Sequence, residues 1–383
     1  MLRNFFIFLF LSFTIAGVSA QQTLIKEIIS DGISRSYTIY IPSTYSPESS
    51  VPLVISMHGF TSNMTQQLQL SDFSALSETN KFIVVYPQGS PSAGGLLTWN
   101  VSEDATGAKD IEFISNLIDT ISRDYNIDAK RVYATGMSMG GFMSYALACN
   151  LPDKIAAIAS VTGSMLISQY ESCNPGRVIP VMDIHGTADP VVGYDGAGAG
   201  QIPIDTLIKF WVDNNKCLTN PEVDNLPNIN ILDKSTVVHY GYTDDVGHTT
   251  VEFYKIIGGG HTWPGSSVFL PFEFIVGPTN FDFSASVEIW RFFSQFTLDG
   301  IQSVDSQISK ANGFNFSPNP TRGTFRIDGI DEPIEMIQLH NLSGEIILQQ
   351  SDQTIDLSTQ KSGIYLISVY TKKSISTRKI IKI

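Results

Sequence analysis

Four stretches of the chain are continuous apolar runs of strand length, and each ends in glycine: "VPLVISMHG", "KFIVVYPQG", "RVYATG" and "RVIPVMDIHG". Such runs are typical of parallel strands buried on both faces of a sheet. An earlier stretch, "SRSYTIYIP", alternates apolar and polar residues, as a half-buried strand does. The pattern therefore predicts a large sheet that is mostly parallel.

Helical patterns lie between these strands. In "DIEFISNLIDTISRDYNID", apolar residues recur at spacings of three and four, at Ile111, Ile114, Ile118, Ile121 and Tyr125. This stripe predicts an amphipathic helix, and its apolar face is expected to pack on the core rather than to bind a ligand. Alternating strands and helices predict an α/β fold with a mostly parallel central sheet.

The pattern changes after about Phe296. The helix-like "ASVEIWRFFSQF" is followed by residues 298–313, which are polar and small without a period and are expected to form a linker. Residues 314–383 contain short β-rich runs separated by turn residues, a pattern that predicts a small all-β sandwich. We therefore expect a main domain at 21–297 and a second domain at 314–383.

The first twenty residues place one arginine before an apolar run and end in Val18-Ser19-Ala20. This pattern is typical of a secretory signal peptide, so residues 1–20 are excluded from the fold. The alternative is a membrane anchor, but the run is shorter than the ~20 residues that a spanning helix needs. No other segment is long and apolar enough to span, so a secreted or outer-surface location is expected.

Composition and charge indicate which partners and cofactors are not expected. The chain has 383 residues, of which 43% are hydrophobic, and its formal net charge is −13. A surface this acidic argues against nucleic acid as a partner. Cys149, Cys173 and Cys217 allow one disulfide in an exported chain and leave one free thiol. None lies at metal-ligand spacing, and no phosphate-binding or calcium-loop pattern occurs, so we expect no metal and no cofactor.

The segment "GMSMG" carries the pattern Gly136-x-Ser138-x-Gly140, which matches a nucleophile elbow. Taken alone the motif is weak, since Ser138 could simply occupy a tight turn. Two further residues follow in order: Asp189 after the strand "VIPVMDI", and His261 after the strand "VEFYKII". Because loops at the carboxyl ends of parallel strands meet at one edge of the sheet, these residues are candidates for one site.

Each candidate has a chemical role. The imidazole of His261 would take the Ser138 proton as the oxygen attacks a carbonyl, and Asp189 would fix the imidazole tautomer. The oxyanion would be bound by the N–H groups of Met139, directly after the nucleophile, and of Phe60, in the loop after an early strand. Gly258, Gly259 and Gly260 are expected to let the chain bend before the histidine, because glycine tolerates positive φ.

Other polar residues are weaker candidates. Asp183 is the rival acid, but it lies within an apolar strand rather than in the loop after it. His58 and His185 precede glycines at strand ends and are expected to have structural or supporting roles. The remaining histidines are expected to be solvated or remote from the site: His239, His248 and His340.

The motifs "GMSMGG", "HGTADPVV" and "GGGHTWPG", with "LVISMHG" before them and "SVEIWRFF" after them, resemble the secreted polyhydroxybutyrate-depolymerase-like esterases of the α/β-hydrolase fold. Feruloyl and acetylxylan esterases of carbohydrate esterase family one are relatives of that group. The resemblance covers roughly residues 24–297. It implies a triad of Ser138, Asp189 and His261 that acts on esters outside the cytoplasm.

The chain departs from this group in places. Met139 stands where asparagine is common, and Gly193 where proline often precedes the tyrosine. Cys217 resembles a position that is usually paired with a later cysteine, which this chain lacks. The resemblance, together with proximity in sequence, therefore implies that Cys149 pairs with Cys173 and that Cys217 is free.

The tail resembles the C-terminal sorting domain of the type IX secretion system. The likeness is carried by "FSPNPTRGTFRI", "LSGEIILQ", "SGIYLISV" and "RKIIKI". It implies a secretion machinery as partner and passage across the outer membrane, followed by release or surface attachment. The alternative is a small carbohydrate-binding module, which the absence of tryptophan from this segment disfavours.

The function expected from these features is hydrolysis of feruloyl or acetyl esters on plant polysaccharide. Trp99 and Trp263 could form an aromatic wall for the substrate, or could equally be core residues. The enzymatic alternative is a polyhydroxyalkanoate depolymerase, although no separate polymer-binding domain is visible. A peptidase is disfavoured because the domain has no room for a propeller or a large lid. The non-enzymatic alternative is an inactive surface-binding protein.

Overall fold

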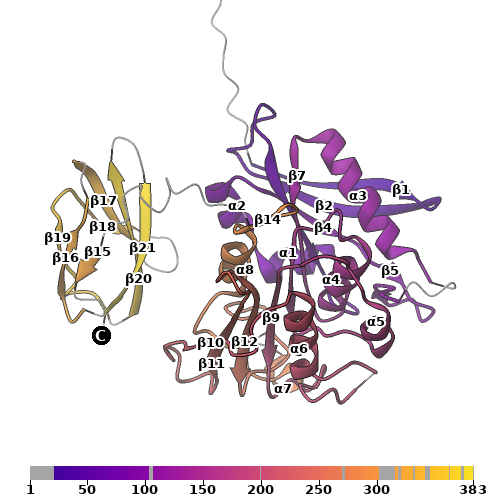
Figure 1. Cartoon of the computed structure of the whole chain (residues 1–383). Coiled ribbons are helices and arrows are strands. Elements are labelled where there is room, and N and C mark those ends of the chain that lie inside the picture. The colour runs from indigo at the N-terminus through magenta and orange to yellow at the C-terminus, as the bar shows by residue number, and fades with distance from the viewer. Residues whose placement is uncertain are drawn as a thin grey trace, which may run out of the picture. The chain divides into compact units, whose positions relative to one another are not determined.

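The computed structural model describes residues 21–102, 107–198, 200–269, 272–301, 315–317, 321–330, 333–340, 346–361, 363–371 and 375–382. The expected signal peptide, residues 1–20, lies outside the described residues. The chain divides into two compact units, Met1–Ile301 and Gln302–Ile383 (Figure 1).

The first unit is built on a ten-stranded sheet with the order β1-β2-β4-β3-β7-β8-β9-β12-β11-β10. The central strands from β4 to β12 in this order are parallel, whereas β1, β2, β11 and β10 pair antiparallel at the two edges. The strand bounds are β1 (Gln22–Ser30), β2 (Ile33–Ile41), β3 (Val51–Met57), β4 (Ile83–Pro87), β7 (Ile127–Met137), β8 (Ala157–Val161), β9 (Val181–Gly186), β10 (Glu222–Asn225), β11 (Thr236–Thr243) and β12 (Thr249–Ile257). The four apolar runs are β3, β4, β7 and β9, so the predicted α/β fold of the α/β-hydrolase type is confirmed.

Helices cover both faces of this sheet. One core cluster combines residues of the sheet with α3, α4 and α6, and a second combines the other face with α1 and α8. The predicted apolar stripe of α3 is buried in the first cluster from Ile111 to Ile121. The helix bounds are α1 (Met64–Ser71), α2 (Ser74–Asn80), α3 (Asp110–Asp124), α4 (Met139–Asn150), α5 (Ile167–Ser172), α6 (Ile204–Asn214), α7 (Glu273–Val276) and α8 (Ala285–Phe293).

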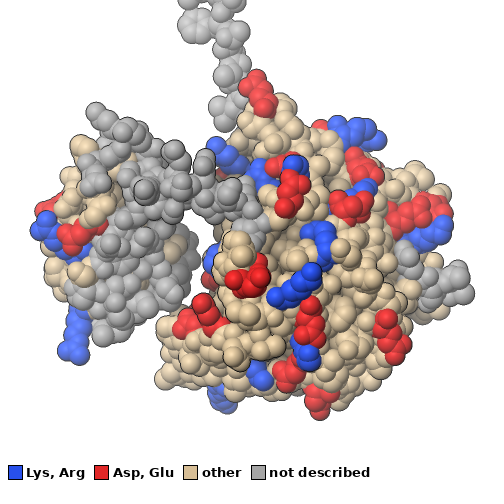
Figure 2. Space-filling model, viewed as in Figure 1, with Lys and Arg blue, Asp and Glu red and all other residues tan. Residues whose placement is uncertain are grey.

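Helix apolarity and the distribution of charged side chains can be compared with what the sequence suggested about membrane and nucleic-acid partners. None of their helices is both long enough and apolar enough to cross a bilayer. Figure 2 shows acidic and basic side chains interspersed over the visible face of the first unit, without a gathering of lysine and arginine there.

Two short hairpins complete the first unit. β5 (Ser90–Pro91) pairs with β6 (Leu97–Thr98), and β13 (Phe296–Thr297) pairs with β14 (Gly300–Ile301). In the turn of the second hairpin, the Leu298 N–H donates to the Lys130 carbonyl (2.9 Å), and Asp299 forms an ion pair with the Lys130 ammonium. Residues 298–301, which the sequence pattern assigned to the linker, therefore lie in the first unit, because their partners come from β7. The rest of the expected linker lies outside the described residues.

The second unit contains two antiparallel sheets that share one hydrophobic core. The three-stranded sheet consists of β15 (Asn315–Ser317), β16 (Thr324–Asp328) and β19 (Thr354–Asp356). The four-stranded sheet consists of β17 (Ile334–His340), β18 (Ile346–Gln350), β20 (Gly363–Thr371) and β21 (Ile375–Lys382). Core residues come from both sheets, for example Phe325 of β16 and Ile367 of β20, as the predicted small β-sandwich requires.

Candidate active site

Ser138 occupies the sharp turn between β7 and α4. Its backbone has φ 56° and ψ −121°, a conformation that a non-glycine residue rarely adopts. The turn is held by the Ser138 N–H, which donates to the Val161 carbonyl (2.8 Å), and by the Ser138 carbonyl, which accepts from the Phe142 N–H (3.0 Å). This is the strained strand-to-helix geometry of a nucleophile elbow.

The glycines of the motif allow the backbone to pack tightly beneath the elbow. A Cβ atom on Gly140 would lie 2.1 Å from the Met57 carbonyl oxygen, and one on Gly136 would lie 2.5 Å from the Gly140 carbonyl carbon. Neither distance is tolerable for real atoms, so any larger residue would push α4 away from the end of β3. The spacing of the motif thus reflects the close approach of three backbone segments.

Asp189 and His261 form a hydrogen-bonded pair. The Asp189 Oδ2 lies 2.8 Å from the His261 Nδ1, and both residues are buried. The Asp189 Oδ1 accepts from the N–H groups of Val191 and Val192, each at 2.8 Å. Because a carboxylate can only accept, the His261 Nδ1 carries the proton and Nε2 keeps the free lone pair that a general base needs.

Close backbone contacts between the two loops bring this pair together. β9 and β12 are parallel neighbours, and a Cβ on Gly186 would lie 2.2 Å from the Gly259 carbonyl oxygen. Only Gly258 has positive φ (78°), whereas a Cβ on Gly260 would lie 2.3 Å from the Val276 carbonyl oxygen. The expectation that all three glycines serve backbone bending is therefore wrong: a Cβ on Gly259 would lie 2.5 Å from the Ile256 side chain, and Gly260 is required by the proximity of the Val276 segment.

His185 packs against the Asp189 carboxylate and the loop that carries it. Its Nε2 lies 2.9 Å from the Val192 carbonyl oxygen and 3.5 Å from the Asp189 Oδ2, and its ring is completely buried. Burial lowers the pKa of His185, which keeps the imidazole neutral. A structural role beside the acid loop was expected for this residue, and its contacts fit that role.

Asp183, the rival acid, lies elsewhere. It is completely buried on β9, where its Oδ2 accepts from the Tyr145 hydroxyl of α4 (2.7 Å). Burial raises the pKa of Asp183 to about 7. Of the two aspartates, the structure hydrogen-bonds Asp189 and not Asp183 to His261.

His58 orients the loop that faces the nucleophile. Its Nδ1 donates to the Gly59 carbonyl (2.7 Å), and its Nε2 accepts from the Gly89 N–H (2.9 Å). Burial lowers the pKa of His58 to about 4, so the ring is neutral. A Cβ on Gly59 would lie 3.2 Å from the Ser138 Cβ, which places this loop directly against the elbow.

Two backbone N–H groups are available near Ser138. In the part of the chain that the structure describes, the Phe60 N–H has no hydrogen-bond acceptor. It points away from the Gly59 carbonyl because the two groups of a trans peptide point in opposite directions. Met139 is the first residue of α4, and the first N–H groups of a helix have no intrahelical acceptor. Among the described residues no acceptor outside the helix is found for the Met139 N–H either, so these two groups remain the candidate donors of an oxyanion hole.

A cavity of about 580 Å³ opens beside Met139, and Trp99 and Leu166 also line it. The Trp99 indole N–H donates to the His58 carbonyl (2.8 Å), so this ring is held against the loop that carries Gly59 and Phe60. Trp263 does not line this cavity. It is 1% exposed, packs edge-on against Phe73 and donates to the Ser286 hydroxyl, which makes it a core residue. Trp99 lines the cavity, but it is also 1% exposed and belongs to the first core cluster, so neither tryptophan presents an open ring face to a substrate.

The cysteines are arranged as the resemblance implied. Cys149, near the end of α4, forms a disulfide with Cys173, directly after α5. Cys217 is free, and its Sγ lies 3.1 Å from the Thr250 hydroxyl.

The remaining histidines lie outside these contacts. His239 was expected to be solvated, but its Nε2 lies 3.0 Å from the Glu252 carboxylate, which also pairs with Arg291. The expectation is wrong because β11 and β12 place these polar side chains side by side. His248 is exposed beside Asp244, and His340 ends β17 in the second unit.

Comparison with protein families matches both parts of the chain. Residues 35–201 match the family model described as esterase PHB depolymerase, and residues 315–383 match the secretion system C-terminal sorting domain. The resemblance drawn from the motifs is thereby confirmed for both parts.

Several curated proteins are similar to this chain. A bifunctional acetylxylan esterase/xylanase of Neocallimastix patriciarum is 30% identical over 76% of this chain and 37% of its own length. Feruloyl esterase B of Piromyces equi is 31% identical over 59% of this chain and 42% of its own length. Poly(3-hydroxyalkanoate) depolymerase C of Paucimonas lemoignei is 28% identical over 56% of this chain and 55% of its own length. The chain thus spans about half the length, or less, of these relatives.

Proposed function

We propose that this chain, whose first domain matches the PHB depolymerase esterase family and whose tail matches a secretion sorting domain, is an exported serine esterase. The observation that carries the proposal is the strained Ser138 turn, which lies against the Gly59 loop at the sheet edge where Asp189 binds His261. A non-glycine residue with φ 56° carries a conformational free-energy cost, and such strained residues cluster at functional sites.

The proposed reaction proceeds through an acyl-enzyme. The Ser138 Oγ attacks the ester carbonyl carbon while His261 Nε2 accepts the hydroxyl proton. The N–H groups of Phe60 and Met139 donate to the oxyanion that forms. Collapse of this intermediate breaks the ester C–O bond, and His261 returns the proton to the departing alkoxide. Water then repeats the two steps on the acyl-serine and releases the carboxylic acid, while Asp189 stabilises the transient imidazolium without taking a proton.

The substrate proposed first is an acetyl or feruloyl ester on plant polysaccharide. Relatives named acetylxylan esterase and feruloyl esterase support it, and so does the cavity of about 580 Å³ next to Met139. A volume of this size has room for an acyl group that includes an aromatic ring.

A polyester is the second candidate substrate, and one observation favours it. The exposed phenylalanines among the described residues are Phe60 (50%), Phe272 (52%) and Phe274 (85%). Phe60 lies on the oxyanion loop, and the other two lie in the segment whose Val276 carbonyl accepts from the His261 N–H. Apolar side chains around a site of this kind suit contact with an apolar solid surface.

The sorting-domain match supports an extracellular or cell-surface location, with the secretion machinery as partner.

The test is to incubate the mature chain with feruloylated, acetylated arabinoxylan and to identify the released acids by mass spectrometry. Ser138→Ala should lower turnover by several orders of magnitude without altering folding, because the triad acts as a unit. Ser144→Ala is the matched control: it lies on the same helix and donates only to the Gly140 carbonyl (3.0 Å), so it should stay active. Ester hydrolysis near the wild-type rate in Ser138→Ala would overturn the proposal. Activity on polyester films alone would select the second substrate.

A further inference from the structure

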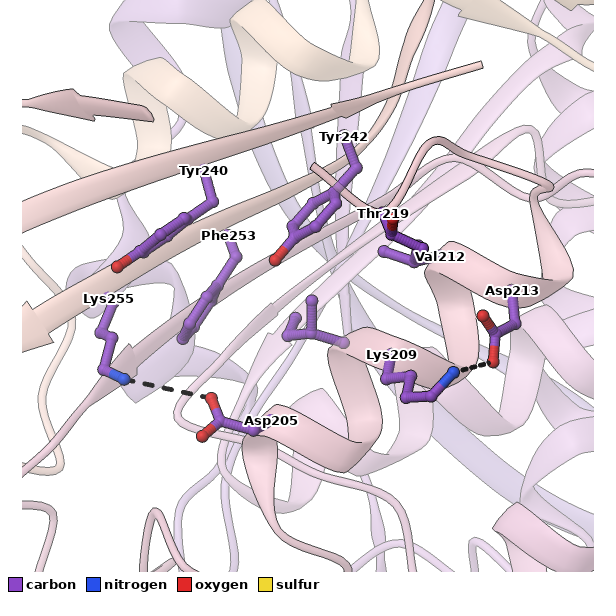
Figure 3. A pocket seen from close by; sticks show the side chains of 10 residues that line it. Asp205, Lys209, Val212, Asp213, Thr219, Tyr240, Tyr242, Phe253 and Lys255 are labelled. Carbon is purple, nitrogen blue, oxygen red and sulfur yellow. Dashed lines mark hydrogen bonds and ion pairs between the residues drawn. The ribbon is translucent and has the colours of Figure 1, made fainter. Parts of the chain in front are cut away.

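An open groove of about 460 Å³ lies between α6 and the strands β11 and β12, apart from the cavity beside Met139 (Figure 3). One wall is aromatic and comes from the two strands, and the other comes from α6. We call it the α6 groove and define it by the residues that line it: Asp205, Ile208, Lys209, Val212, Asp213, Thr219, Tyr240, Tyr242, Phe253 and Lys255.

Three aromatic rings lie in a row along the strand side of the groove (Figure 3). Tyr240 and Tyr242 are two residues apart on β11, so both side chains leave the same face of the sheet. Phe253 of β12 is 3% exposed and forms the floor, and the Tyr240 ring stacks on it with centroids 5.9 Å apart. The two tyrosines are only partly buried. Their ring surfaces are therefore open to a ligand in the groove.

The charged residues of the groove are balanced. The Lys209 ammonium lies 2.6 Å from the Asp213 carboxylate, and the Lys255 ammonium lies 4.0 Å from the Asp205 carboxylate. Two positive and two negative groups leave the groove without net charge. Each carboxylate can accept about four hydrogen bonds and each ammonium can donate three, so the pairs retain capacity for a polar ligand.

These features select a class of ligand. An anionic or cationic polymer would gain no net attraction from a neutral groove. A wholly apolar ligand would remove the charged groups from water without replacing their hydrogen bonds. A neutral sugar chain can contact both walls of the groove. Its C–H faces pack on the electron-rich faces of the aromatic rings, and its hydroxyls form hydrogen bonds with the charged side chains.

We infer that the α6 groove is a second binding site of the esterase domain, and that its ligand is a short segment of a neutral polysaccharide. The binding itself does not rest on the proposed function, whereas its benefit for ester hydrolysis and the choice of xylan as the test polysaccharide do. Binding there would hold the polymer on the enzyme and raise the effective concentration of its ester groups at the catalytic site.

Two side chains, Tyr194 and His185, connect the groove to the loop after β9 that carries Asp189. The Tyr194 ring lies against Phe253 (6.4 Å between centroids) and beneath the Lys255 ammonium (4.5 Å). On its other side, Tyr194 contacts the His185 ring (6.2 Å), and His185 lies 3.5 Å from the Asp189 carboxylate. The groove and the Asp189 loop are therefore linked through the side chains of Tyr194 and His185.

The test is isothermal titration of the full mature chain, carrying Ser138→Ala, with unsubstituted xylohexaose. This ligand has no ester, so binding is measured independently of hydrolysis. Adding Tyr240→Ala or Tyr242→Ala should weaken binding by about tenfold or more, and the matching Phe variants should retain it because the ring face is kept. Tyr45→Ala is the matched control: this half-buried tyrosine also has one ring neighbour, Tyr125, at 5.9 Å, but lies outside the groove, so its affinity should be unchanged.

A second readout uses the active enzyme. The two Ala variants should raise KM on acylated xylan and leave kcat/KM on a small aryl ester unchanged. Thermal melts exclude unfolding as the cause, and one folded Ala variant suffices for the test. Equal xylohexaose affinity in wild type and folded variants, or loss of affinity in Tyr45→Ala as well, overturns the groove assignment. If xylohexaose binds as described but no acyl group is released from xylan, the groove stands and the proposed substrate falls.

Discussion

His58 links the stability of the first domain to pH. The usual pKa of 6.5 falls to about 4 in the folded chain because the ring is buried. Between these values the unfolded chain binds a proton that the folded chain does not, so the free energy of unfolding falls as pH falls from about 6.5 to about 4. A pKa difference of about 2.5 corresponds to about 3 kcal/mol. Replacing His58 with a side chain that does not titrate removes this loss.

Two amide variants separate the hydrogen bonds of His58. Asn places its amide near the former Nδ1 and can still donate to the Gly59 carbonyl, whereas Gln reaches the former Nε2 and can still accept from the Gly89 N–H. Both should abolish the pH-dependent loss. Only His58→Gln should also reduce kcat, by up to about a hundredfold, because the peptide carrying the Phe60 N–H loses its anchor.

Tryptophan fluorescence during urea unfolding at pH 4 to 7 is a suitable assay. All four tryptophans, Trp99, Trp211, Trp263 and Trp290, lie in the first unit, so the signal does not report on the tail. The quantity to compare is the difference in unfolding free energy between wild type and variant, because other carboxyl groups titrate in both. A difference that stays constant from pH 7 to pH 4 would refute the reasoning.

Two further predictions concern buried groups of the first domain. Because burial raises the pKa of Asp183 from 3.8 to about 7, the folded chain holds a proton that the unfolded chain loses, and stability falls as pH rises through this window. Asp183→Asn should match wild type near pH 4 and exceed it by up to about 4 kcal/mol above pH 7, in the same unfolding assay; equal stability at both pH values would count against it. The disulfide Cys149–Cys173 closes a sequence separation of 24 residues, so reduction should lower the unfolding free energy by about 3 kcal/mol. A Cys149→Ser, Cys173→Ser double variant that is insensitive to reductant is the control, and a wild-type loss below about 1 kcal/mol would contradict the estimate.

Much of the central fold could be predicted from the sequence because its strands are buried on both faces. A run such as "VPLVISM" has no polar residue except Ser56, and the Ser56 hydroxyl is hydrogen-bonded internally. The hairpin at residues 296–301 could not be predicted in this way. Its turn is polar, and the contacts that hold it are made with Lys130, which is remote in sequence.

Part of the candidate site could likewise be predicted from the sequence and part could not. Ser138, Asp189 and His261 could be proposed from the sequence because strand ends followed by small residues are visible as patterns, and the structure pairs Asp189 with His261. The burial of Trp263 could not be predicted, because the direction of a side chain in the loop after β12 depends on α1 and α8, which belong to the same core cluster. The Tyr240 and Tyr242 groove was missed for a similar reason, since an i, i+2 pair of tyrosines on a strand is as common in a core as on a binding surface.

Asp183 and Asp189 show why position, rather than residue type, decides which carboxylate can serve a histidine. Six residues separate them, yet Asp183 lies inside a strand, where burial favours its protonated form and Tyr145 is its hydrogen-bond donor. Asp189 lies one turn beyond the strand, where the backbone N–H groups of two successive residues point at one of its oxygens. These donors occupy one oxygen of Asp189 and leave the second oxygen for His261. Moving the acid back into the strand would therefore remove both its backbone donors and its contact with His261.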